Sequence, residues 1–169
     1  MSRTICETPR LVLRELAESD FDALSTVLTD AEVMRFSVRG VEDAEGVRRF
    51  ILNNLARYAR DGVGQWAVVR RDTGVCIGVC GISTQKLDGV REQEISYRLA
   101  RSAWGAGFAT EAAVACRDYG FHTRKFSRLV SIIEAANERS IRVAQKVGLS
   151  AEKTAVFHGI PVIVFSAHR

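Results

Sequence analysis

The sequence predicts an α/β (α+β) fold: one domain in which helices flank a mixed, mostly antiparallel and twisted sheet of about seven strands. The chain has 169 residues, of which 47% are hydrophobic. This is long enough for one complete hydrophobic core and too short for two. Two patterns predict the sheet and its helices: consecutive strand-like runs in the middle of the chain, and alternating helix and strand in the second half.

The first half of the chain begins with a strand and continues as helix. In residues 10–16, leucines alternate with charged side chains, which is the period of a half-buried strand. Helical spacing follows in residues 17–28, in a short piece near 30–35 and in a longer segment near 43–60. Three strand-like runs come next, at 65–71, 75–83 and 92–100. Their short connections contain glycine and predict an antiparallel meander.

The second half of the chain alternates helix and strand and ends in a hairpin. The predicted elements are a helix from Phe108 to about Phe121, a strand at 128–133, a helix at 137–148 and strands near 149–157 and 161–167. Asn137 is suited to cap the second of these helices. Gly148 stands where a residue in the left-handed conformation would end it.

Charge and composition exclude several classes of protein. The formal charge is +4, but the 24 Lys and Arg residues are spread among 20 acidic residues, so we expect no nucleic-acid partner. No apolar stretch approaches the 18 or so residues of a membrane-spanning helix, and the N-terminus lacks the apolar centre of a signal peptide. We therefore expect a cytoplasmic protein with no membrane partner. The four cysteines form no CxxC pair and have no nearby histidine, so we predict no metal site.

The segment WGAGFATEA, residues 104–112, places small residues where a strand runs into a helix. A P-loop is excluded because no lysine follows either glycine, and a dinucleotide fingerprint meets Thr110 where its third glycine should stand. The pattern (Q/R)xxGx(G/A) fits better. In it, Gly107 and Ala109 keep the turn free of bulky side chains, and N–H groups at the helix N-terminus bind phosphate. Close packing of helix on sheet is the alternative role of these small residues.

Three segments together resemble the GNAT superfamily of N-acetyltransferases, which use acetyl-CoA. They are TPRLVLRELAESDFDAL, EISYRLARSAWGAGFATEAA and NERSIRVAQKVGL. Within the superfamily they are similar to the branch of ribosomal-protein N-terminal (alanine) acetyltransferases. The resemblance extends from about Thr8 to Ala167, so we assign residues 8–169 to one acetyltransferase domain. It implies a sheet that is splayed between its fourth and fifth strands, residues 92–100 and 128–133.

The resemblance also implies which residues bind acetyl-CoA. Its pyrophosphate would lie on the turn formed by Trp104, Gly105, Ala106, Gly107, Phe108, Ala109 and Thr110. Its pantetheine arm would pair with the backbone of Ser96, Tyr97, Arg98 and Leu99, and its sulfur end would approach Asn137 and Ser140. The branch generally has glycine at the position of Ser96 and a basic residue at that of Ala106. Many members carry a tyrosine acid in the helix at 137–148; it is absent here, so Ser140 or water is the candidate acid.

Acetyl transfer by direct attack needs an uncharged amine and no enzyme nucleophile. The strand period of two places Glu94, Ser96 and Arg98 on one face of the segment 92–100. Glu94 therefore shares the face of the proposed thioester strand and is our candidate for the general base, directly or through water. A solvated carboxylate on a strand is the alternative interpretation of Glu94.

These observations predict an acetyl-CoA-dependent N-acetyltransferase that acts on the α-amine of a protein or peptide N-terminus. An α-amine with a pKa near 7.8 is roughly a tenth neutral at pH 7, whereas lysine is less than about a thousandth neutral, so a weak base suffices for the first. Two alternatives stay open: acetylation of a small molecule such as an antibiotic, an amino acid or a polyamine, and a non-catalytic acetyl-CoA-binding sensor. Family analogy also implies a possible homodimer.

Overall fold

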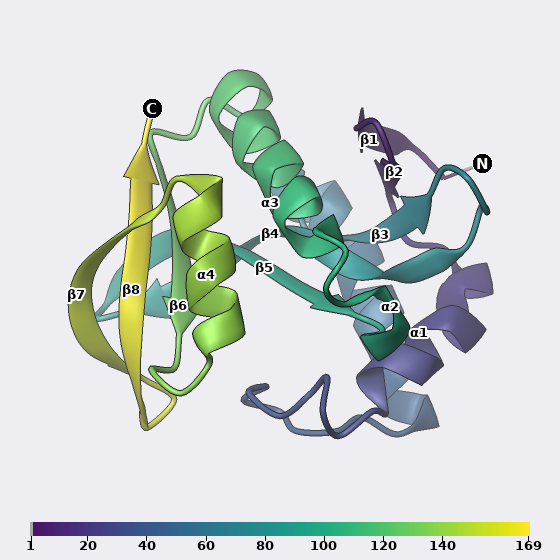
Figure 1. Ribbon diagram of the computed structural model, residues 1–169, viewed down its shortest axis with the longest axis horizontal. Coiled ribbons are helices and arrows are strands. Elements are labelled where there is room, and N and C mark those ends of the chain that lie inside the picture. Colours follow the sequence, from purple (N-terminus) through teal and green to yellow (C-terminus); the bar gives the residue numbers. More distant parts are fainter. Residues whose placement is uncertain (1) are drawn as a thin grey trace.

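An eight-stranded sheet organises the protein, and the computed structural model describes residues 2–169 of it (Figure 1). The strands are β1 (Thr4–Glu7), β2 (Leu11–Arg14), β3 (Gln65–Arg70), β4 (Cys76–Leu87), β5 (Val90–Leu99), β6 (Arg128–Ile133), β7 (Ser150–Phe157) and β8 (Ile160–His168). Their order across the sheet is β1-β2-β3-β4-β5-β6-β8-β7. Every neighbouring pair is antiparallel except β5 and β6, which confirms the predicted mixed and mostly antiparallel sheet.

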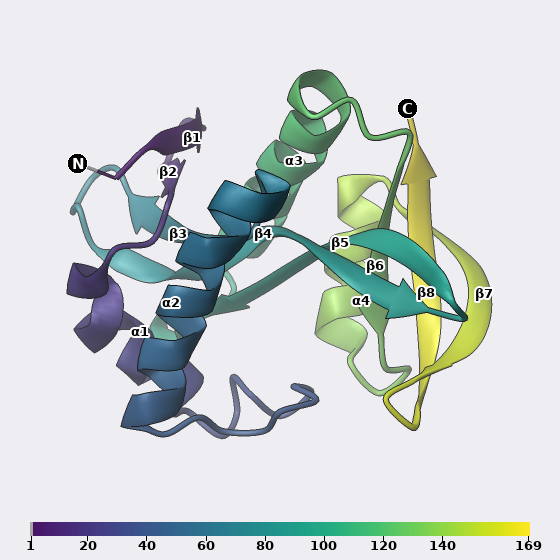
Figure 2. The ribbon, with the colours of Figure 1, turned by 180° about the vertical axis from the view of Figure 1, so that it is seen from behind.

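Helices lie on both faces of this sheet. They are α1 (Phe21–Leu28), α2 (Ala44–Asp61), α3 (Phe108–Asp118) and α4 (Glu138–Val147). On one face, seen in front in Figure 2, Val47 and Ile51 of α2 share an apolar cluster with Ala67 of β3. On the other face, Cys116 of α3 packs in a cluster with Trp66, the neighbour of Ala67 along β3. No helix within residues 2–169 is long and apolar enough to cross a membrane.

The pairing of β5 with β6 is confined to one point. Glu94 and Val130 form the single parallel pair, and the Ser131 hydroxyl donates to the Ile95 carbonyl at 2.9 Å. Beyond this point the strands diverge, β5 toward the turn before α3 and β6 toward α4 (Figure 1). The splay implied between the fourth and fifth predicted strands is therefore present, between β5 and β6.

The structure differs from the sequence prediction in three places. β1 adds an eighth strand and lies before residue 8, where the sequence places the start of the domain. The short helix expected near 30–35 is absent, and residues 31–36 form consecutive turns, because so short a segment does not offset the cost of helix nucleation. β4 and β5 extend further than expected, to a tight turn at Asp88 and Gly89, whose φ angles of +49° and +78° suit a two-residue hairpin.

Candidate active site

The turn between β5 and α3 has the open backbone that the sequence predicted. Gly105 and Gly107 have φ angles of +77° and +82°, which only glycine adopts without strain. Gly107 is the N-cap residue of α3 and has no side chain with which to cap the helix. The first N–H groups of α3 and the positive end of its dipole are thus directed into the turn, as anion binding requires.

Arg10, which directly precedes β2, contacts this turn, a role that the sequence analysis missed. Its guanidinium donates to the Ala106 carbonyl at 2.8 Å and to the Glu111 carboxylate at 2.6 Å. It also lies 4.5 Å from the centroid of the Phe108 ring, within the range of a cation–π contact. The Thr8 hydroxyl and the Arg10 backbone N–H also donate to the Glu111 carboxylate. The stretch TPR at the start of the resemblance is therefore part of the turn's support.

Trp104 fastens the end of β5 next to the turn. Its indole N–H donates to the Leu99 carbonyl at 2.8 Å. The Arg139 guanidinium from α4 lies 4.5 Å from the centre of the Trp104 ring. Trp104 thus contacts both walls of the splay, the end of β5 and the first turn of α4.

The face of β5 that is turned toward α3 and α4 brings together three of the predicted residues. Tyr97 donates from its hydroxyl to Ser140 Oγ at 3.2 Å, and Asn137 Oδ1 accepts from the Ser140 N–H at 3.2 Å. Asn137 is the N-cap of α4, and Gly148 ends the helix with a φ of +88°, so both predicted caps are confirmed. Burial raises the pKa of Tyr97 to about 12, which keeps its hydroxyl protonated at neutral pH.

The opposite face of β5 carries Glu94, Ser96 and Arg98, as the strand period predicted. Ser96 Oγ accepts a hydrogen bond from Gln65 Nε2 at 3.0 Å, and Ser83 Oγ accepts one from the same nitrogen at 3.1 Å. Gln65 lies on β3 beneath α2, where its backbone N–H donates to Asn54 Oδ1. The hydroxymethyl group of Ser96 therefore points toward α2, away from α3 and α4. Sequence reasoning missed Gln65, whose buried Oε1 has no partner within residues 2–169.

Glu94 is buried, with 8% of its surface exposed. Burial raises the pKa of this carboxylic acid to about 7, against smaller opposing effects of the Gln85 amide, the Arg98 guanidinium and the Ile132 N–H. A group with this pKa exchanges protons readily at neutral pH. The solvated-carboxylate interpretation of Glu94 is therefore wrong in its premise, because water does not surround the side chain.

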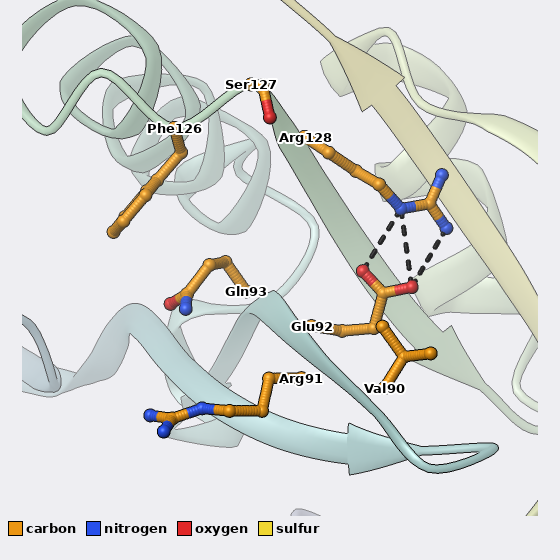
Figure 3. A pocket seen from close by; sticks show the side chains of 7 residues that line it. All are labelled: Val90, Arg91, Glu92, Gln93, Phe126, Ser127 and Arg128. Atoms are coloured by element: carbon orange, nitrogen blue, oxygen red, sulfur yellow. Dashed lines mark hydrogen bonds and ion pairs between the residues drawn. The ribbon is translucent and has the colours of Figure 1, made fainter.

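A separate cavity lies where β5 and β6 begin. Its volume is about 280 Å³, and Figure 3 shows Glu92 and Arg128 facing each other in its wall, 3.0 Å apart. None of the predicted site residues lines it. Among the described residues, no group of three or more His, Cys, Asp or Glu side chains is placed to hold a metal ion.

A splayed sheet with a glycine-containing turn at its opening is shared with a known class of enzymes. The family model described as "Acetyltransferase (GNAT) domain" matches residues 10–150. The chain therefore belongs to the GNAT acetyltransferase family. It is an acyltransferase, and acetyl-CoA, the acetyl donor of the family, is its co-substrate.

Individual relatives agree with this assignment. The chain is 35% identical over 165 residues to the uncharacterized protein YkkB of Bacillus subtilis, covering 97% of this chain and 95% of that one. It is 30% identical to a crystallised acetyltransferase from Agrobacterium tumefaciens, with a TM-score of 0.83 and coverage of 97% and 94%. RimL, a ribosomal alpha-N-protein acetyltransferase solved with coenzyme A, has a TM-score of 0.81, 19% identity and 98% coverage of both chains, a similarity of fold.

Proposed function

We propose that this acetyltransferase acts on the α-amine of a protein or peptide N-terminus. The observation that carries the proposal is the buried Glu94, whose pKa of about 7 lies close to that of an α-amine, near 7.8. A proton passes between groups of similar pKa at little cost, whereas removing one from lysine, with a pKa near 10.4, is more expensive. RimL, which shares the fold, is described as acting on a protein α-amine, and this supports the proposal.

In this proposal acetyl-CoA is bound by the turn and the open edge of β5. The pyrophosphate-binding residues are those of the turn, Trp104 to Thr110, where the two glycines leave the backbone uncovered. The Ile95 carbonyl faces β6, so the alternation of a strand turns the peptide of Tyr97 to the same edge. That peptide pairs with the pantetheine arm, while Ser96, Arg98 and Leu99 hold the strand in place around it.

Proton transfer is divided between the two faces of β5. On the α2 face, the Glu94 carboxylate takes one proton from the acceptor ammonium, and the free amine forms the new C–N bond with the thioester carbon. As the C–S bond breaks, the nitrogen loses its second proton to water, and the product is a neutral amide. On the α4 face, the thiolate takes a proton from the Ser140 hydroxyl, and Tyr97, which donates to Ser140, replaces it. Tyr97 then regains its proton from water. Ser140 or water was the candidate acid from the sequence; the Tyr97 hydroxyl behind Ser140 is an addition from the structure.

Two further expectations from the sequence stay predictions. A homodimer is supported by β7, a sheet edge whose residues are mostly exposed, among them Val156 at 62%. A cytoplasmic location rests on the sequence alone.

The acceptor is tested by titrating the coenzyme A thiol released across a panel of N-terminal peptides and small amines. We expect peptides with a free α-amine to exceed small amines in kcat/KM by about 10-fold or more, and blocked peptides with an internal lysine to be inactive. Turnover of small amines alone would favour the small-molecule alternative. A rise in Tm with acetyl-CoA but no thiol release would favour the sensor.

Replacing Gly107 by valine is expected to abolish the rise in Tm that acetyl-CoA causes, because a ligand stabilises only the state that binds it. A Cβ at this residue lies 3.4 Å from the Arg10 guanidinium, and the residue itself has a φ of +82°. Gly74→Val is the matched control, since Gly74 has a φ of +71° and open space around it. The test is thermal denaturation of both variants with and without acetyl-CoA. If acetyl-CoA raises the Tm of Gly107→Val as much as that of the wild type, our placement of the pyrophosphate is contradicted.

Glu94→Gln is expected to lower kcat/KM by about 10²-fold at pH 8 and to leave the KM for acetyl-CoA unchanged. Glu94 must be ionised to accept a proton, so wild-type kcat should decline as the pH falls below about 7. The variant should lack this decline, whereas Glu18→Gln, which changes an exposed carboxylate, should keep it. A decline that persists in Glu94→Gln would assign the proton transfer to another group.

Tyr97→Phe and Ser140→Ala are each expected to reduce kcat by about 10-fold. Because the two hydroxyls act in series, the double variant should lose no more than either single one. Steady-state kinetics of the three variants with saturating acetyl-CoA make the comparison. Additive losses would show that the hydroxyls act separately, and unchanged rates would leave water as the acid.

A further inference from the structure

Arg98 is the third residue on the Glu94 face of β5, and its surroundings are unusual for a cation. Its side chain is partly buried, and desolvation lowers the pKa of its guanidinium. The side-chain contact of this group is a long hydrogen bond from Nη2 to Ser37 Oγ, 3.4 Å. Ser37 belongs to the connection between α1 and α2, so Arg98 lies between β5 and that connection.

No carboxylate of the described chain forms an ion pair with Arg98. Glu94 and Glu42 are the acidic groups that affect it, and neither is within 4.0 Å of its guanidinium. Glu42 instead has Arg39 and Arg49 within 3.6 and 3.7 Å.

Two other partly buried arginines of this protein, Arg14 and Arg128, have close acidic partners. Arg14 lies 2.7 Å from Asp20, and Arg128 lies 3.0 Å from Glu92. A desolvated charge without a counter-charge destabilises a protein. Such a charge is retained at little net cost if a bound substrate brings the missing anion.

We propose that Arg98 binds a carboxylate of the acceptor, so that the preferred substrates are peptides with an acidic side chain at the second or third residue. This inference rests on the proposed function. Glu94 and Arg98 are four residues apart on one face, about 13 Å along the strand. An extended peptide advances about 3.3 Å per residue. With its α-amine at Glu94, its second or third side chain comes within reach of the long arginine side chain.

The geometry distinguishes this arrangement from recognition of a free amino acid. The α-carboxylate of an amino acid is separated from its amine by one carbon atom, a much shorter span than the roughly 13 Å between the backbones of Glu94 and Arg98. A carboxylate carried several bonds from the amine, on a peptide or on a small molecule, fits the separation. The charge is also placed to attract acidic acceptors before they bind.

The test uses pairs of peptides that differ only in glutamate or glutamine at the second or third residue. For the wild type we expect kcat/KM to be about 10-fold higher for the glutamate peptide, because its KM is lower. This ratio should decrease as the salt concentration rises. Arg98→Gln should remove this ratio, and Arg98→Lys should restore part of it. Arg39→Gln, which removes an exposed cation from the α1–α2 connection, should leave the ratio intact. A wild-type ratio near one, or equal losses for both peptides in Arg98→Gln, overturns the proposal.

A pair of small amines separates this inference from the proposed function. 6-Aminohexanoate and its amide differ by the same charge at a similar distance from the amine. If only small amines are acetylated, the peptide-terminus proposal fails, and the acid-to-amide ratio in wild type and Arg98→Gln decides the role of Arg98. If acidic and neutral peptides are acetylated equally well, the proposed function stands and the role of Arg98 is rejected.

Discussion

The divergence of β5 from β6 after a single parallel pair is the constraint on which the site depends. Neighbouring strands of a sheet normally continue their hydrogen bonds along their length. Unpaired backbone groups at an exposed edge are unfavourable when buried and can pair with a strand of another chain. Here the Ser131 hydroxyl occupies the Ile95 carbonyl and the Trp104 indole occupies that of Leu99. The unpaired stretch is thereby shortened to the region around Tyr97. So short an open edge fits the proposed pairing with the cofactor arm and leaves little backbone for another strand to pair with.

The same divergence leaves the two faces of β5 in contact with different elements. Because side chains alternate along a strand, Tyr97 and Glu94 reach opposite faces of β5. On one face, the Tyr97 hydroxyl contacts Ser140 at the start of α4. On the other face, which is covered by α2, Ser96 accepts a hydrogen bond from Gln65 of β3. The two faces therefore carry different titratable groups: burial keeps the Tyr97 hydroxyl protonated at neutral pH and raises the pKa of Glu94 to about 7.

The sequence predicted the features that depend on local spacing. The two faces of β5, the cap at Asn137 and the end of α4 at Gly148 all follow from residues a few positions apart, and the structure contains them. The contacts made by Arg10, Gln65 and the Tyr97 hydroxyl join segments that are distant in sequence, and no periodicity encodes such pairs. The splay was expected only from the family resemblance. It consists of missing hydrogen bonds between β5 and β6, and such an absence has no local pattern in the sequence.

The anchoring of the turn by Arg10 has a consequence for how the molecule holds together. Its partners Ala106 and Glu111 lie about a hundred residues further along the chain, so these contacts form only when the start of β2 and the turn before α3 are brought together. The two parts then share one stability, since loosening either releases the other. A ligand that stabilises the turn accordingly also protects the start of β2 from local opening.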